Sequence, residues 1–210
     1  MFTGIVQAVG QITEVQPIEV QDHDKSGLRL SIDAGSLDMG DVKIGDSIAV
    51  QGACMTVTSK LASGFTVDVS RESLNRTVGL GKPGKVNLEK SLCLGDPLGG
   101  HLVSGHVDGL GRVVEFTQVG ESWKLLIEVP ADLGMYLAYK GSVAVNGVSL
   151  TVNQVVDESG MTRFHMNLIP HTVAVTTLQD LKVGDAVNIE VDTIARYVHR
   201  MIKASQMPAR

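Results

Sequence analysis

The amino-acid sequence predicts an all-β protein, made of two tandem six-stranded Greek-key β-barrels related by internal duplication and a C-terminal α-helix. Three observations lead to this fold class. The two halves of the chain repeat the same motifs, short runs of alternating apolar and polar residues fill both halves, and one amphipathic stretch stands at the end.

The repetition defines the domains. Three segments of the first half return in the second half in the same order, at offsets of 101, 95 and 101 residues. They are residues 4–12 and 105–113, 51–57 and 146–152, and 86–89 and 187–190. A period of about 100 residues is too long for a solenoid unit and suits a whole small domain. With the Gly/Pro-rich stretch 94–100 as a linker, we expect domains at 1–97 and 98–192 and a helical tail at 193–210.

The period-two pattern of half-buried strands recurs in each copy. It is seen in residues 28–33 and their counterpart 123–128, and in 47–50, 65–69 and 86–89. Turn residues separate these runs, and no helical stretch between them is suited to a parallel crossover. We therefore expect about six antiparallel strands in each copy, closed into a barrel that leaves no exposed edge.

Residues 193–205 carry a helical pattern, and Asp192 precedes them as a suitable N-cap. A lone helix after two barrels has no sheet of its own to cover. We therefore favour packing of its apolar stripe against the helix of another subunit, with packing on its own barrel as the alternative. The stripe consists of Ile194, Val198, Met201 and Ile202.

Composition excludes several classes of protein. The 210-residue chain has a net charge of −5 and 18 scattered basic residues, so no nucleic-acid partner is expected. No apolar run is long enough for a membrane span, and the first residues do not resemble a signal peptide. Two cysteines, Cys54 and Cys93, are too few for a disulfide scaffold, which indicates a cytoplasmic protein. The histidines lack metal-ligand spacing, and a dinucleotide-like motif at 79–84 precedes a strand pattern and contains Pro83, so we expect neither metal nor nucleotide.

Equivalent strands of the two copies carry small polar pairs. Cys54 and Thr56 correspond to Ser149 and Thr151, and residues two apart on a strand face the same side. A buried core thiol is the ordinary interpretation of a lone cysteine. Because its counterpart is a serine, we favour a pocket. His106, which stands where the first copy has Ile5, is either an ordinary strand histidine or a catalytic group.

Several motifs together resemble the riboflavin synthase family, alpha-subunit type. They are residues 1–6, 99–106, 146–152 and 167–172, and the resemblance covers essentially the whole chain. It implies two six-stranded barrels and a homotrimer held by the C-terminal helix. It also implies a cofactor-free reaction in which two molecules of 6,7-dimethyl-8-ribityllumazine give riboflavin and 5-amino-6-ribitylamino-uracil. Association with a lumazine synthase is left open.

The resemblance also implies a site between the N-terminal barrel of one subunit and the C-terminal barrel of its neighbour. On the N-terminal side it places Gly4, Ile5, Val6, Cys54, Met55, Thr56, Asp68, Val69, Ser70, Arg71, Glu72 and Ser73. On the C-terminal side it places Gly105, His106, Val107, Lys140, Ser149, Leu150, Thr151, Asn167, Leu168, Ile169, Pro170, His171 and Thr172. Phe2, Ser47 and Asp192 match further positions near that site.

The two halves of such a site must differ, because one substrate donates a four-carbon unit and the other accepts it. Cys54 against Ser149, and Ile5 against His106, are differences of this kind. His106 is the candidate base for a methyl proton, and Cys54 or Ser149 is a candidate nucleophile or water-positioning group. We also count Thr151, Asp192 and Ser47 among the candidate catalytic residues.

Two other functions remain open at this point. A non-catalytic lumazine- or flavin-binding antenna protein would use the same two barrels, but such proteins let one pocket decay, whereas both copies keep their polar pairs here. A purely structural double barrel would leave those pairs without a role. Two positions depart from the family's pattern. Asn146 stands where some members carry an acid, so we assign it no proton-transfer role, and Gln51 replaces an asparagine, which leaves the hydrogen bonding of the first barrel open.

Overall fold

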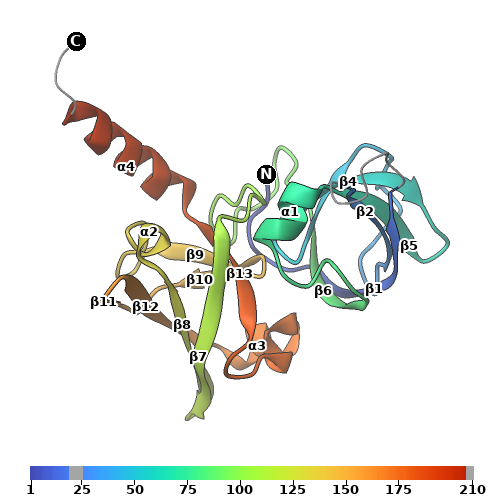
Figure 1. Ribbon diagram of the computed structural model, residues 1–210. Coiled ribbons are helices and arrows are strands. Elements are labelled where there is room, and N and C mark those ends of the chain that lie inside the picture. Colours follow the sequence, from blue (N-terminus) through green and yellow to red (C-terminus); the bar gives the residue numbers. More distant parts are fainter. Residues whose placement is uncertain (19–25, 207–210) are drawn as a thin grey trace.

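The computed structural model describes residues 1–18 and 26–206 as two β-structures side by side, with one helix extending away from both (Figure 1). The first half comprises β1 (Ala8–Pro17), β2 (Leu28–Asp33), β3 (Ser47–Val50), β4 (Ala53–Lys60), β5 (Gly64–Val69), α1 (Arg71–Arg76) and β6 (Gly84–Lys90). The second half comprises β7 (Gly109–Val119), β8 (Ser122–Pro130), α2 (Ala131–Gly134), β9 (Ser142–Val145), β10 (Val148–Thr151), β11 (Gln154–Glu158), β12 (Met161–Leu168), α3 (Pro170–Ala174), the 3-10 helix η2 (Thr177–Asp180) and β13 (Ala186–Val191). Helix α4 (Thr193–Ser205) follows, so the predicted all-β duplication with a terminal helix is confirmed.

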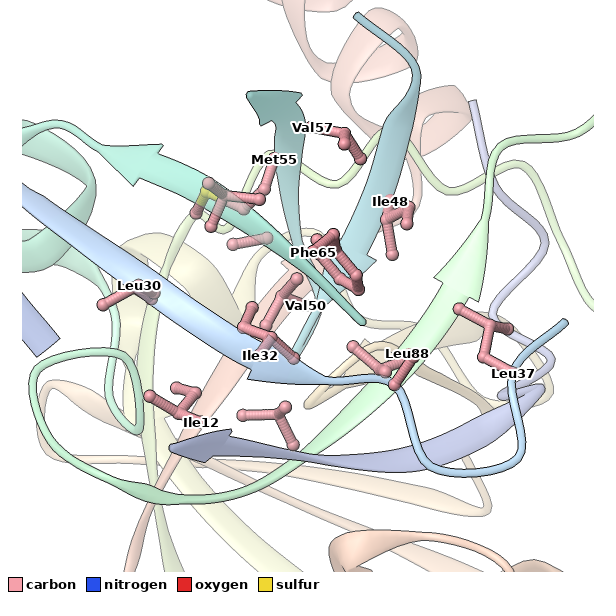
Figure 2. Close-up of a cluster of buried hydrophobic side chains, with 14 of the residues drawn as sticks. Ile12, Leu30, Ile32, Leu37, Ile48, Val50, Met55, Val57, Phe65 and Leu88 are labelled. Carbon is pink, nitrogen blue, oxygen red and sulfur yellow. The ribbon is translucent and has the colours of Figure 1, made fainter. Parts of the chain in front are cut away.

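The first half is a closed antiparallel barrel in the order β1-β2-β5-β4-β3-β6. Strand β3 pairs with β4 and β6 and not with β2, which is a Greek-key connection. Every second side chain of a strand points into the barrel. Leu30 and Ile32 of β2 point inward and are fully buried, whereas Ser31 between them is not part of the core. Both inward-facing side chains belong to the cluster of buried apolar residues that also contains Phe65 (Figure 2). The period-two pattern therefore decides which side chains form this core.

The second half is a seven-stranded sheet in the order β10-β9-β13-β7-β8-β12-β11, which is not closed, where the sequence predicted a closed barrel of six strands. The two edge strands, β10 and β11, are consecutive in the chain and are joined by Val152 and Asn153; together they take the place of β4. In β4 the register shifts between Val57 and Ser59, a bulge that bends the strand without ending it. In the second half the strand is interrupted at this point. The Val152 amide donates to the Gly141 carbonyl at 2.9 Å, but the equivalent Val57 amide donates to the Asp46 carbonyl at the same distance, so this hydrogen bond is common to both halves.

Each half sends the segment before its first strand across to the other half. The first crossing segment, residues 1–7, packs on the C-terminal sheet, where Val6 contacts the core. The second crossing segment, residues 101–107, packs on the N-terminal barrel, where Val107 contacts the core. A division at residue 97 therefore separates each sheet from a segment that packs against it.

A small apolar cluster lies where the two crossing segments meet. Phe2 and Val103 exchange two backbone hydrogen bonds, at 2.7 and 3.1 Å, and both are buried. Ala49 of β3 and Ala144 of β9 complete the cluster, and Cys54 packs against it. The pseudo-twofold relation between the halves passes through this cluster, since each of these pairs joins equivalent positions of the two copies.

Buried amides also join the two halves. Asn87 donates from Nδ2 to the Asn146 carbonyl, and Asn188 donates from Nδ2 to the Gln51 carbonyl, both at 2.9 Å. Both asparagines are almost fully buried. Buried polar groups of this kind are costly unless they are paired, so the contact specifies one arrangement of the two halves.

Helix α4 begins at its predicted cap, where Asp192 accepts a hydrogen bond from the Ile194 amide at 2.8 Å. Only its first turns contact the second half, through an Arg196–Asp108 ion pair and a His199–Tyr136 ring contact. No residue of the helix is buried, so the stripe does not pack on its own barrel. The exposed apolar residues are Ile194, Tyr197, Val198, Met201 and Ile202. No helix in the described part of the chain is long and apolar enough to cross a membrane.

Candidate active site

Two equivalent surfaces hold most of the predicted site residues. The N cradle is the outer face of β4 at Cys54 and Thr56, together with the second crossing segment at Gly105 and His106. Inward-facing neighbours on β4 fill the barrel core, so the cysteine and the threonine point away from it. Thr56 and His106 are exposed, and Cys54 is half-buried. The surface thus offers a thiol, a hydroxyl and an imidazole to a ligand.

Close backbone contact fixes the N cradle. The Cys54 amide donates to the Gly105 carbonyl at 2.8 Å. Gly105 has a φ of +78°, and a Cβ at this position would lie 2.7 Å from the Cys54 Cβ. Glycine is therefore required here by both conformation and space. His106 follows directly, so its place on the surface depends on this contact.

The C cradle is the outer face of β10 at Ser149 and Thr151, together with the first crossing segment at Gly4 and Ile5. The Ser149 amide donates to the Gly4 carbonyl at 2.8 Å, and Gly4 has a φ of +76°. A Cβ on Gly4 would lie 2.6 Å from the Ser149 Cβ. Ile5 is exposed and takes the position that His106 holds in the N cradle.

The crossing changes which residues share a cradle. From the sequence we expected residues 4–6 on the side of Cys54 and residues 105–107 on the side of Ser149; the structure shows the reverse. The physical reason is that the Gly4 carbonyl accepts a hydrogen bond from the Ser149 amide and the Gly105 carbonyl accepts one from the Cys54 amide, so each segment lies against a strand of the opposite half. The imidazole at His106 therefore stands beside the thiol, not beside the hydroxyl.

A buried carboxylate secures each crossing segment. Glu89 of β6 accepts hydrogen bonds from the Thr3 amide at 2.6 Å, the Thr3 hydroxyl at 2.7 Å and the Gly4 amide at 3.0 Å. Burial raises the pKa of Glu89, although these hydrogen bonds act in the opposite direction. The carboxylate sets the position of Gly4 and thereby of Ile5 at the surface.

Glu190 of β13 plays the same part in the second copy. It accepts from the Ser104 amide at 2.6 Å, the Ser104 hydroxyl at 2.7 Å and the Gly105 amide at 2.9 Å. The Ser104 hydroxyl in turn accepts a hydrogen bond from the His106 amide at 3.3 Å. The backbone on both sides of Gly105 is thus fixed before His106 reaches solvent.

Ser149 has a further partner, His101. The His101 Nδ1 lies 2.7 Å from the Ser149 Oγ, and His101 is 8% exposed. Burial lowers the pKa of His101, and the negative charge of Asp192 opposes that shift. Asp192, one of the predicted catalytic residues, is the N-cap of α4. Its link to the C cradle is the effect of its charge on the pKa of His101.

The polar residues at the end of β5 are largely paired with one another. Arg29 binds both carboxylate oxygens of Asp68, at 2.7 and 2.8 Å, and these hydrogen bonds lower the pKa of Asp68. Ser70 caps α1 by accepting a hydrogen bond from the Ser73 amide at 3.1 Å. The predicted binding residues that complete this segment are Arg71 and Glu72, both in α1.

The equivalent end of β12 is more open. Lys140, with a φ of +64°, directs its amine toward the Asn153 side chain at 3.5 Å. Helix α3 begins with a proline, and its cap residue is an apolar side chain that is largely exposed. The predicted residues on this surface are Asn167, Ile169, Pro170 and His171, which are exposed, and Thr172, which is half-buried.

Four of the predicted binding residues have their side chains in the hydrophobic cores of the two halves. They are Met55, Val69, Leu150 and Leu168, with exposed fractions of 4%, 1%, 8% and 1%. Phe2 is fully buried in the cluster between the halves. These residues cannot offer side chains to a ligand at the surface; they shape the cradles from beneath.

A cavity of about 690 Å³ lies beside the first crossing segment, between β3 and the linker before the second half. Ser47 and Ile5 line it, but Cys54 and Thr56 do not. Ser47 of β3 nevertheless pairs directly with Thr56 of β4, so it lies on the same face as the polar pair. The other polar residues of this wall are Thr3, Gln7, Asp41, Asp46, Glu89, Lys90, Ser91, Cys93 and Asp96.

Three residues of the two cradles were missed from the sequence. Glu89 and Glu190 ended the repeated segments 86–89 and 187–190, and identical carboxylates in a repeat were a usable signal. His101 lay within the motif 99–106 without an assigned role. In the described residues, no group of three or more histidine, cysteine or acidic side chains could hold a metal ion.

Comparison with known proteins agrees with this duplicated architecture. The lumazine binding domain matches residues 3–91 and again residues 104–192. A riboflavin synthase of Photobacterium phosphoreum is 45% identical over 204 residues, 96% of this chain and 89% of the relative. A riboflavin synthase of Mycobacterium tuberculosis is 43% identical over 209 residues, 98% of this chain and 100% of the relative.

Solved structures give the same fold. LumP complexed with riboflavin superimposes with a TM-score of 0.77 at 27% identity, over 91% of this chain and 99% of that chain. LumP complexed with 6,7-dimethyl-8-(1'-D-ribityl) lumazine gives a TM-score of 0.76 at 26% identity, over the same shares of the two chains. With both halves matched by one domain model and relatives aligned over nearly their full lengths, the chain belongs to the riboflavin synthase family.

Proposed function

We propose that the protein converts two molecules of 6,7-dimethyl-8-ribityllumazine into riboflavin and 5-amino-6-ribitylamino-uracil, without a cofactor. The observation that carries this proposal is the pair of equivalent but chemically unlike cradles. One holds a thiol and an imidazole, at Cys54 and His106, and the other holds a hydroxyl bonded to an imidazole, at Ser149 and His101. Two copies of one substrate in different roles need such a pair.

Orientation supplies much of the proposed rate. Holding two reactants in a productive geometry contributes up to roughly 7–11 kcal/mol of the barrier. The backbone contacts of Gly4 and Gly105 hold the surface groups of each cradle in place before a ligand arrives. Such preorganisation suits a reaction between two identical ring systems that must meet in one relative orientation.

His106 is the proposed base for the methyl proton of one substrate. It is exposed, and its backbone is held by Ser104 and Glu190 through Gly105. A positioned acid–base group contributes roughly 10²–10⁴-fold to a rate. We therefore expect His106→Gln to lower kcat by this factor with little change in riboflavin affinity, measured by steady-state kinetics and fluorescence quenching. Wild-type turnover would contradict the assignment.

We propose that a complete site forms between the N cradle of one subunit and the C cradle of another, in a homotrimer. Thr56, His106, Ile5 and Thr151 are all exposed in a single chain, as expected for surfaces that a second subunit or substrate covers. The exposed apolar stripe of α4 is a suitable contact for assembly. The free thiols of the chain fit a reducing cytoplasm.

A non-catalytic lumazine-binding protein is the second candidate, because the LumP structures share the fold. It is less well supported, since the riboflavin synthases are 43% and 45% identical to this chain. Incubation with 6,7-dimethyl-8-ribityllumazine alone separates the two. We expect one riboflavin for every two lumazines consumed, unaffected by EDTA. Stoichiometric binding without turnover would favour the second candidate.

A further inference from the structure

The His101 imidazole and the Ser149 hydroxyl form a hydrogen-bonded pair. The imidazole end of the pair is buried, and the serine end is partly accessible. His101 Nδ1 lies 2.7 Å from Ser149 Oγ. His101 Nε2 is buried and has no hydrogen-bond partner among the described residues. Ser149 is half-buried and shares the outer face of β10 with the exposed Thr151. The serine end of the pair therefore faces the C cradle.

Backbone closes the space behind the pair. A Cβ at Gly100 would lie 2.1 Å from the Thr3 carbonyl oxygen and 3.0 Å from Ser149 Oγ. The His101 amide donates to the same Thr3 carbonyl at 3.0 Å. These contacts fix the backbone at His101, and the residue itself is only 8% exposed, so the Nδ1–Oγ hydrogen bond is a fixed feature of the cradle.

The position of the imidazole proton decides what Ser149 does. Burial favours the neutral ring, which carries one N–H. If the proton were on Nε2, a buried N–H would have no acceptor. If it is on Nδ1, it is donated to Ser149 Oγ and only a lone pair at Nε2 is unmatched. Buried N–H groups without a partner are rarer than buried acceptors without one.

We propose that His101 is a positioning residue, which donates Nδ1–H to Ser149 and thereby directs the serine hydroxyl proton into the C cradle. Ser149 then serves as a hydrogen-bond donor to an acceptor atom of a bound heterocycle, such as a ring carbonyl oxygen or an unprotonated ring nitrogen. The inference rests on the proposed function, which places such a ring against this cradle. It excludes Ser149 as a base-activated nucleophile, because activation needs an imidazole lone pair facing the hydroxyl.

The pair also distinguishes the two cradles. Cys54, the counterpart of Ser149, presents a thiol, which is a weak hydrogen-bond donor. Its side chain packs against the apolar cluster between the halves. Only the C cradle, within the described residues, thus combines a hydroxyl with an imidazole that sets its direction. A substrate with a strong acceptor atom is better oriented there.

The first test reads the tautomer directly. The full-length protein is labelled with ¹⁵N-histidine, and long-range ¹H–¹⁵N correlation spectra are recorded near neutral pH. The His101 signals are assigned by their absence in His101→Asn. We expect a neutral ring protonated on Nδ1. A ring protonated on Nε2, or on both nitrogens, would overturn the proposal. The measurement needs no turnover, so an inactive wild-type protein would refute the proposed function and leave this result readable.

The second test asks whether His101 acts through Ser149. Loss of one hydrogen bond of ordinary strength corresponds to roughly 10-fold in kcat/KM. We expect about this loss in His101→Leu and in Ser149→Ala, and no further loss in the double variant, because residues that act as a unit are not additive. Additive losses would show that His101 does not act through Ser149.

Two conservative variants complete the test. His101→Asn keeps an N–H donor near the position of Nδ1, so we expect kcat/KM within roughly threefold of wild type. Ser149→Cys supplies a better nucleophile but a poorer donor, so we expect it to be as impaired as Ser149→Ala. Activity of Ser149→Cys at or above wild type would identify a nucleophile and overturn the proposal. A His101→Asn variant as impaired as His101→Leu would do so as well.

Discussion

Substitution of Gly105 by alanine tests the contact that joins the second crossing segment to the N cradle. Gly105 has a φ of +78°, and an alanine there costs about 1–2 kcal/mol because of its conformation alone. Its Cβ would lie 2.7 Å from the Cys54 Cβ and 2.9 Å from both the Cys54 amide nitrogen and a ring carbon of Phe2. Overpacking of this kind costs about 1–3 kcal/mol. Together, Gly105→Ala should lower the free energy of unfolding by about 2–5 kcal/mol.

A matched control separates the two contributions. Gly160, in the turn between β11 and β12, has a φ of +87°, and a Cβ added there would meet no atom within 4 Å. Gly160→Ala should therefore cost only the conformational term of about 1–2 kcal/mol. Gly4→Ala, where the Cβ would lie 2.6 Å from the Ser149 Cβ, should match Gly105→Ala. The pair of cradle variants and the turn variant thus differ in crowding and not in backbone conformation.

Urea denaturation measures the free energy of unfolding of each variant, and the rate of riboflavin formation measures the effect on activity. We expect Gly105→Ala to lower kcat as well, since the added methyl group separates Cys54 from the segment that carries His106. Equal stabilities of Gly105→Ala and Gly160→Ala would refute the claim that the crossing segment is tightly packed on β4. Full activity of a destabilised Gly105→Ala would refute the link between this contact and the site.

Other parts of the molecule lead to three further predictions. Asn188→Ala removes three side-chain hydrogen bonds between the halves and should cost about 2–4 kcal/mol of unfolding free energy; an unchanged urea midpoint would contradict this. Because burial lowers the pKa of His101 in the folded state, its contribution to stability is present above about pH 6.5 and is lost as the pH falls through the lowered pKa. His101→Asn should therefore flatten the decline of unfolding free energy on the acid side, and parallel pH curves for the two proteins would argue against a buried neutral imidazole. Deletion of residues 194–210 should shift sedimentation from trimer to monomer and reduce turnover, whereas a truncated monomer with full activity at nanomolar concentration would place the whole site in one chain.

Local pattern was sufficient to predict most of the elements. The alternation in residues 28–33 and the cap at Asp192 each depend on nearby residues, and both gave the observed strand and helix. The break in the second sheet at Val152 was missed, because Thr151 and Val152 repeat Thr56 and Val57 of the unbroken strand. Whether a bend remains a bulge or ends the strand depends on the hydrogen bonds of neighbouring strands.

The arrangement of the cradles was harder to predict, for a reason that lies in the duplication itself. The first crossing segment contacts β10 in the same way as the second contacts β4, because the segment and the strand are both repeated in the sequence. A sequence pattern alone cannot distinguish a segment that stays on its own barrel from one that crosses. Contacts between residues far apart in the chain decide this, such as the hydrogen bonds from the Ser149 amide to the Gly4 carbonyl and from the Cys54 amide to the Gly105 carbonyl.

The exchange of segments determines the chemistry of both cradles at once. If each segment stayed on its own barrel, Cys54 would share a surface with Ile5, and Ser149 with His106. Because the segments cross, the solvent-exposed imidazole of His106 stands beside the thiol of Cys54, and Ser149 faces an aliphatic neighbour and the buried His101. We propose that the difference between isoleucine and histidine at this position gives the N cradle a group that can accept a proton and leaves the C cradle without one there. Under the proposed function, this asymmetry gives two identical substrates different roles, although the two halves share one fold.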